Sequence, residues 1–293
     1  MRLATLAPFL FVLLWSTGFI GAKLGLPYAE PFTFLWLRML LVVGLLTVLA
    51  WWLRAPWPRG WALKLHLGVS GLLLHAGYLG GVFFAISRGM PAGLSALIVG
   101  LQPILTAILA QYLLRERVSV GQWAGLLLGF GGVALVVLDP KRQGLAGGGT
   151  LEASAFVAIG LALLCTTLGT LYQKRFAAEM PLVGGTVVQY VAAAGALWLL
   201  AQLFGERMQI HWTPQFVFAL AWLSLVLSIG AILLLMYLIR HNSASRVASL
   251  FYLVPPATAL EAYLLFGERL GLWSFLGLAL AALGVAWVVR STS

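Results

Sequence analysis

Charged residues are scarce in this sequence: they make up 9% of its 293 residues, whereas 62% are hydrophobic. The mean hydropathy is +1.00. So few polar side chains cannot cover a folded domain of this size in water. The composition excludes an ordinary soluble protein and predicts an integral membrane protein.

Groups that carry catalysis are also scarce. Cys165 is the single cysteine, which excludes an intramolecular disulfide, and no histidine pair has metal-binding spacing. The sequence has no G-x-x-x-x-G-K-[ST] phosphate loop. We therefore expect no catalytic residues, no metal and no cofactor. A membrane-embedded lipid-processing enzyme stays open as an alternative, because separated residues can converge in a fold.

Long apolar runs are abundant by contrast. About 20 apolar residues cross ~30 Å of hydrocarbon as a helix, and such runs follow one another almost end to end. They predict an all-α membrane protein with ten transmembrane helices, at 4–22, 32–53, 62–87, 91–114, 118–138, 151–173, 182–204, 213–239, 244–266 and 270–290.

The basic residues that produce the formal charge of +10 stand singly at the ends of these spans. This pattern argues against a nucleic-acid partner and fits the positive-inside rule. A cytoplasmic N-terminus would give the inner side Arg2, Arg54, Arg59, Lys64, Arg115, Arg117, Lys174, Arg175, Arg240, Arg246 and Arg290, and the outer side Lys23, Arg88, Lys141, Arg142, Arg207 and Arg269. We expect both termini to be cytoplasmic, in a bacterial inner membrane.

The chain contains an internal repeat. The segment "LQPILTAILAQYLLRERVS" at 101–119 returns as "LVPPATALEAYLLFGERLG" at 253–271, with Pro103 and Pro255 152 positions apart. Extending this offset gives two five-helix repeats, 1–140 and 151–293, joined by a loop at 141–150. Because five crossings are an odd number, the second repeat should be inverted relative to the first. Inverted repeats are typical of secondary transporters, although duplication kept only for packing is an alternative.

The repeated segments resemble a known family. The run "LRERVSVGQWAGLLLGFGGVALVV" at 114–137, its partner "FGERLGLWSFLGLALAALGVAWVV" at 266–289, and "PFTFLWLRMLL" at 31–41 are similar to the EamA-type branch of the drug/metabolite transporter superfamily. The resemblance covers essentially the whole chain. It implies ten helices in a plan similar to that of YddG-type amino-acid exporters, and an exporter-like role for metabolites or amino acids.

Prolines near the centres of two predicted spans are candidate hinges or gates. Pro103, Pro255 and Pro256 each remove an amide that would bond the carbonyl four residues earlier. Free carbonyls in lipid are costly unless they face a polar cavity or a neighbouring helix. These residues therefore line or bend a transport path, or they form static kinks.

Polar residues present in one repeat but not in the other are candidate substrate contacts, because a substrate is asymmetric. They are Trp15, Ser16, His75, Tyr78, Gln102 and Tyr252. A neutral His75 bonded inside the protein is the alternative to direct ligand contact. Glycines spaced by four, including Gly125 and Gly129, instead predict close helix packing.

Two charged residues within predicted spans are candidates for charge coupling, since their burial in a membrane is expensive. Arg38 could hold a substrate carboxylate, pair with Glu261 or snorkel to the outer surface. Glu261 could carry a proton, or be paired or solvated near its helix end. The partners that we expect are the lipid bilayer and a small-molecule substrate; no protein partner is evident.

The sequence thus predicts a secondary or facilitative exporter of small amphipathic metabolites, in particular amino acids including aromatic ones, that works by alternating access. Nucleotide-sugar or drug transport is the alternative. A channel fits less well, because it requires a continuous polar stripe or charged rings.

Overall fold

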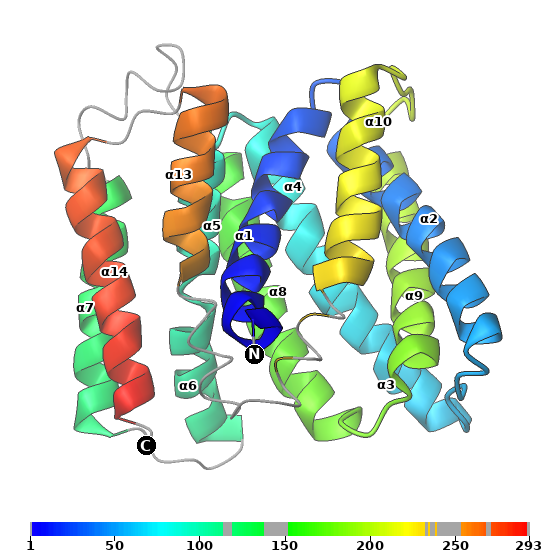
Figure 1. Cartoon of the computed structure of the whole chain (residues 1–293), viewed down its shortest axis with the longest axis horizontal. Helices are drawn as coiled ribbons and strands as arrows, with labels where there is room; N and C mark the ends of the chain where they lie inside the picture. Colours follow the sequence, from blue (N-terminus) through cyan, green and yellow to red (C-terminus); the bar gives the residue numbers. More distant parts are fainter. Residues whose placement is uncertain are drawn as a thin grey trace. The chain divides into compact units, whose positions relative to one another are not determined.

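The computed structural model describes residues 2–113, 119–137, 152–231, 234, 238, 253–267 and 271–291. Within these residues the regular structure is helical, and the one β feature is an isolated bridge between Ala29 and Ile210. Figure 1 shows the helices coloured along the sequence. The described part of the chain is that of an all-α membrane protein, as its composition predicts.

The helices of the first half are α1 (Arg2–Gly25), α2 (Pro31–Trp52), α3 (Trp61–Gly71), η1 (Leu72–Gly77), α4 (Tyr78–Ser87), α5 (Ala92–Val99), α6 (Gln102–Leu113) and α7 (Val120–Val137). Those of the second half are α8 (Ala153–Phe176), α9 (Leu182–Leu203), α10 (Pro214–Ala221), η3 (Trp222–Ala231), α13 (Val254–Phe266) and α14 (Leu272–Arg290). The elements η1 and η3 are π-helical.

Six helical runs among the described residues are long and apolar enough to cross a membrane: Leu6–Gly25, Pro31–Trp52, Trp61–Ser87, Ala153–Phe176, Leu182–Leu203 and Pro214–Ala231. The predicted spans at 91–114, 118–138, 244–266 and 270–290 contain α5 with α6, α7, α13 and α14. The ends of the predicted and observed helices agree within a few residues wherever both are described.

The three prolines lie in the first turns of two helices, and their role as hinges or gates stays a prediction. The α5 helix ends at Val99, and α6 begins at Gln102, so Pro103 lies in the first turn of a new helix. Pro255 and Pro256 likewise lie in the first turn of α13. Proline is tolerated there because the amide that it lacks would have no partner in the helix.

The described residues form two compact units, and each unit takes helices from both halves of the sequence. Unit 1 comprises the described residues of 1–20, 88–155 and 229–293, and unit 2 those of 21–87 and 156–228. The division into compact units therefore differs from the division of the sequence into repeats.

In unit 1, α7 and α14 lie side by side and antiparallel (Figure 1). A Cβ added at Gly132 would meet Gly277 and Ala281, and one added at Gly284 would stand 2.5 Å from both the Gly125 oxygen and the Gly129 nitrogen. These backbones approach so closely because glycine has no side chain. The close packing predicted for Gly125 and Gly129 is confirmed.

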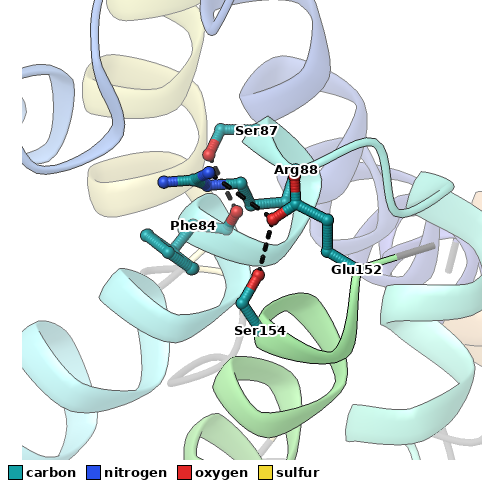
Figure 2. A network of polar contacts seen from close by, with 5 residues as sticks. All are labelled: Phe84, Ser87, Arg88, Glu152 and Ser154. Atoms are coloured by element: carbon teal, nitrogen blue, oxygen red, sulfur yellow. Dashed lines mark hydrogen bonds and ion pairs between the residues drawn. The ribbon is translucent and has the colours of Figure 1, made fainter.

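A surface ion pair in unit 1 holds the turn after α4 to the start of α8. Arg88 Nη1 lies 3.4 Å from Glu152 Oε2, and the Ser154 hydroxyl donates a hydrogen bond of 2.8 Å to the same oxygen (Figure 2). Both charged side chains are about half exposed, so the pair contributes at most about 1 kcal/mol.

In unit 2, α2 packs along α9, and the Glu206 carboxylate after α9 caps the N-terminus of α2. Its oxygens accept from the amides of Phe32 at 3.0 Å and Thr33 at 2.7 Å, and from the Thr33 hydroxyl at 2.7 Å. A carboxylate at this position satisfies amides that lack a helical partner and opposes the positive end of the helix dipole. This cap fixes the start of the helix that carries Arg38.

Candidate functional site

Arg38 is the one charged residue among the fully buried polar side chains of the described part of the chain. It lies two turns inside α2, and 3% of its surface is exposed. Its Nη2 donates to the Ser228 hydroxyl at 3.1 Å, while its buried Nε has no hydrogen-bond partner among the described residues. Snorkelling requires the guanidinium to reach the surface, so this alternative does not describe Arg38.

Two tyrosines and a histidine of unit 2 interact electrostatically with Arg38. These residues are Tyr190 of α9, Tyr78 of α4 and His75 of η1. The His75 and Tyr190 rings lie 4.3 Å apart between centroids. The structure thus brings together three of the predicted site residues, Arg38, His75 and Tyr78.

Gln189 of α9 adds an amide group to these side chains. The Gln189 amide approaches His75 and donates to Gln173 Oε1 of α8 at 3.0 Å. Gln189 and Tyr190 are each 3% exposed. We call Arg38, His75, Tyr78, Gln189, Tyr190 and Ser228 the Arg38 cluster. Within this cluster Arg38, Gln189, Tyr190 and Ser228 are buried, whereas His75 and Tyr78 are partly exposed.

The two π-helical segments position members of this cluster. His75 lies in η1, and Ser228 lies in η3. The Ser228 hydroxyl donates at 3.1 Å to the carbonyl of Leu223, five residues earlier. A π-helix places residues five apart next to each other, and short π segments within α-helices are frequent at functional sites.

A second polar contact lies in unit 1, where Glu261 of α13 meets Ser16 of α1. Their oxygens Oε1 and Oγ are 2.6 Å apart, and Ser16 Oγ is also 2.9 Å from the Leu13 carbonyl. The Thr258 hydroxyl donates to the Ser16 carbonyl at 3.3 Å. The Ser16 hydroxyl has one hydrogen, which it cannot donate fully to both the Leu13 carbonyl and Glu261. Both contacts are therefore complete hydrogen bonds only when Glu261 is protonated and donates to Ser16 Oγ.

Arg38 and Glu261 have separate partners, in unit 2 and unit 1 respectively. The direct pair of Arg38 and Glu261 stays a prediction. The second oxygen of Glu261, Oε2, is buried and has no hydrogen-bond partner among the described residues.

The other predicted site residues lie in unit 1 or outside the described residues. The Trp15 ring packs on Phe11, with centroids 5.3 Å apart, and Gln102 is the first residue of α6. Pro255 and Pro256 line a small apolar recess together with Gly100. Tyr252 lies outside the described residues.

Metal chemistry has no visible basis in the described part of the chain. There, no three His, Cys, Asp or Glu side chains gather closely enough to hold a metal ion. The Arg38 cluster offers hydrogen-bond donors, one positive charge and aromatic surface, which are suited to binding an organic molecule.

Comparison with known proteins identifies the family of this helical membrane protein. The EamA-like transporter family matches the chain twice, over residues 2–138 and 153–290. The chain belongs to the EamA-like transporter family. The family resemblance inferred from the repeated segments is confirmed.

Several relatives match this EamA-like protein along most of their length. The uncharacterized transporter YvbV of Bacillus subtilis (strain 168) is 28% identical over 98% of this chain and 91% of the relative. A protein of Salmonella typhimurium named probable amino-acid metabolite efflux pump is 29% identical over 89% of this chain and 86% of the relative. The uncharacterized inner membrane transporter YedA of Escherichia coli (strain K12) is 25% identical, over 98% and 92%.

A solved crystal structure has the same fold as this EamA-like protein. Its TM-score is 0.67 with 21% sequence identity, and the match covers 100% of this chain and 99% of the other. At that identity the likeness concerns the fold alone.

Sequence reasoning missed Gln189, Tyr190 and Ser228. The offset of 152 held a signal for all three, because it pairs Arg38 with Tyr190 and Ser228 with Ala76. Both pairs differ in polarity between the repeats, which was the criterion that selected His75 and Tyr78. Gln189 pairs with Leu37 and meets the same criterion.

Proposed function

We propose that this EamA-like protein is a secondary or facilitative transporter that exports small amphipathic metabolites, in particular amino acids including aromatic ones. Transport proceeds by alternating access between two inverted five-helix repeats, 1–140 and 151–293. The observation that carries the proposal is the Arg38 cluster of unit 2, a polar site that contains the one buried charge among the described residues. The Salmonella typhimurium relative named probable amino-acid metabolite efflux pump supports the substrate class.

Helix irregularities support the repeat. The family matches the two halves separately. The π segment η1, at 72–77, maps by the offset of 152 onto 224–229, which lies inside η3. The same offset maps the first residue of α6, Gln102, onto the first residue of α13, Val254. If the two halves arose by duplication and kept the same fold, their helices should have irregularities at equivalent positions.

Reciprocal contacts support the inversion. Gly132 meets Ala281 while Gly284 meets Gly129, and the offset of 152 relates these two contacts to each other. Such an exchange is the signature of a two-fold axis between equivalent elements. Because α7 and α14 are antiparallel, an axis between them turns one repeat upside down relative to the other, which is the symmetry that alternating access uses.

The alternatives differ in the charge that they need at the site. A nucleotide sugar carries more than one negative charge on its phosphates, whereas the described interior offers one cation, Arg38. A cationic drug would be repelled by this cation. A membrane-embedded lipid-processing enzyme would need a nucleophile or a paired acid and base, and the Arg38 cluster contains no carboxylate and no cysteine.

Hinge and coupling roles complete the proposal. Pro103, Pro255 and Pro256 lie in the first turns of α6 and α13, so these are the places where a rocking motion could be absorbed. Glu261 is a candidate proton carrier. Both termini are cytoplasmic, in the inner membrane of a bacterium.

Efflux from liposomes tests this function. Purified protein is reconstituted in liposomes loaded with a mixture of amino acids, a nucleotide sugar and a cationic dye, and the released compounds are identified with and without a pH gradient. Amino acids should leave faster than from protein-free liposomes, without ATP. Release of the nucleotide sugar or the dye alone would contradict the proposed substrate class.

A further inference from the structure

Within unit 2, the positive charge of Arg38 lacks a counter-charge. Its one hydrogen bond is to a neutral hydroxyl, that of Ser228, and no carboxylate of the described residues pairs with it. Tyr78 and Tyr190, which interact with it electrostatically, are phenols and not carboxylates. A buried cation without a partner is expensive, and in membrane proteins such groups mark substrate or ion sites.

Ser228 holds the guanidinium in one orientation. Its single hydroxyl hydrogen is used toward the Leu223 carbonyl, so toward Arg38 the oxygen can act only as an acceptor. It receives Nη2, and the buried Nε of Arg38 has no hydrogen-bond partner among the described residues. The Nε–H is thus a donor that a ligand oxygen can accept from, and the planar guanidinium group matches the two oxygens of a carboxylate.

We propose that Arg38 is the subsite for the carboxylate of the transported molecule, with Ser228 as its positioning residue. This inference rests on the proposed function and narrows it to monocarboxylates. One buried cation balances one negative charge, whereas a diphosphate would remain under-compensated. Tyr78 and Tyr190 can donate their hydroxyl hydrogens to the same carboxylate, and the ring pair of His75 and Tyr190 supplies an aromatic surface beside it.

The comparison of an amino acid with its carboxamide isolates the charge, because the two molecules share size and side chain. Liposomes containing the full-length protein are loaded with L-leucine, L-phenylalanine or L-threonine, or with the corresponding carboxamide. We expect release of the acid to exceed release of the amide by about ten- to hundredfold, which is the range of a charge-assisted hydrogen bond. Equal release of acid and amide by the wild-type protein would overturn the proposal.

Variants then assign this preference to the two residues. Arg38→Gln should abolish the preference for the acid, and Arg38→Lys should keep part of it because the charge remains. Ser228→Ala should raise the KM for the acid with little change in kcat and little effect on the amide, whereas a purely structural defect would affect both compounds alike. Arg207→Gln, a change of an exposed arginine, is the matched control and should keep the wild-type ratio.

The outcomes separate this inference from the proposed function. Amino-acid release with an unchanged acid preference in Arg38→Gln would overturn the carboxylate subsite and leave the exporter in place. No release of any amino acid by the wild-type protein would overturn both. If Arg38→Gln does not fold, the wild-type comparison and Ser228→Ala still decide, because neither depends on that variant.

Discussion

The antiparallel contact between α7 and α14 allows a stability prediction with an internal control. An alanine Cβ at Gly132 would stand 2.6 Å from the Ala281 nitrogen, a backbone atom that cannot rotate away. An alanine at the neighbouring Gly131 would meet nothing within 4 Å. Both substitutions gain the same helix propensity, up to about 1 kcal/mol. The difference between the two variants therefore isolates the cost of the contact.

We expect Gly132→Ala to be less stable than Gly131→Ala by about 1–3 kcal/mol, the usual cost of added volume in a well-packed interface. Gly284→Ala should behave like Gly132→Ala, because it meets the equivalent backbone from the other helix. The free energy of unfolding is measured in detergent micelles by denaturant titration, followed by tryptophan fluorescence. Equal stability of Gly131→Ala and Gly132→Ala, within about 0.5 kcal/mol, would refute the close approach of the helices.

Three further predictions concern the cap, the proton and the topology. Glu206→Gln should lower the free energy of unfolding by about 1 kcal/mol through the weakened α2 cap, with the exposed Glu179→Gln unchanged in the same titration. If efflux proves proton-driven, Glu261→Gln should remove its pH dependence, and coupling retained in that variant would exclude Glu261. In a Cys165→Ser background, cysteines in the 54–64 loop should react with an impermeant thiol reagent only from the cytoplasmic side; labelling from outside would contradict the topology.

Much of the helical organisation follows from hydropathy alone. Spans of about 20 apolar residues have few alternatives in a bilayer, so α2 and α9 lie within a residue or two of their predicted positions. The repeat was also visible, because an offset of 152 survives in residues such as Pro103 and Pro255. The family followed from that repeat.

Local helix geometry was less predictable. A proline in the sequence indicates that a helical hydrogen bond is missing. It does not indicate whether one helix bends there or a new helix starts. At Pro103 the structure starts a new helix, because α5 ends at Val99 and α6 begins at Gln102. The π segments have no proline or other marker in the sequence, since they depend on packing between helices.

The site was predictable in part. Arg38 stands out in any apolar span, and His75 and Tyr78 followed from comparing the repeats. The partner of Arg38 was not evident, because nothing in the sequence distinguishes Ser228 from other serines. Its contact with the arginine depends on the π-helical geometry of η3. Side chains that converge from distant segments are invisible to a pattern read along the chain.

The interleaving of the two halves has a consequence for biosynthesis. Gly132 of α7 packs on Ala281 of α14, about 150 residues later in the chain. At a ribosomal rate of about 5–20 residues per second, α7 waits roughly 8–30 s in the membrane before its partner is made. During that interval the glycine face of α7 has no partner from α14 and can pack against other helices. Proteases that remove unassembled membrane proteins can also reach it. Slowing translation after α7 should therefore lower the yield of the protein, even though its sequence is unchanged.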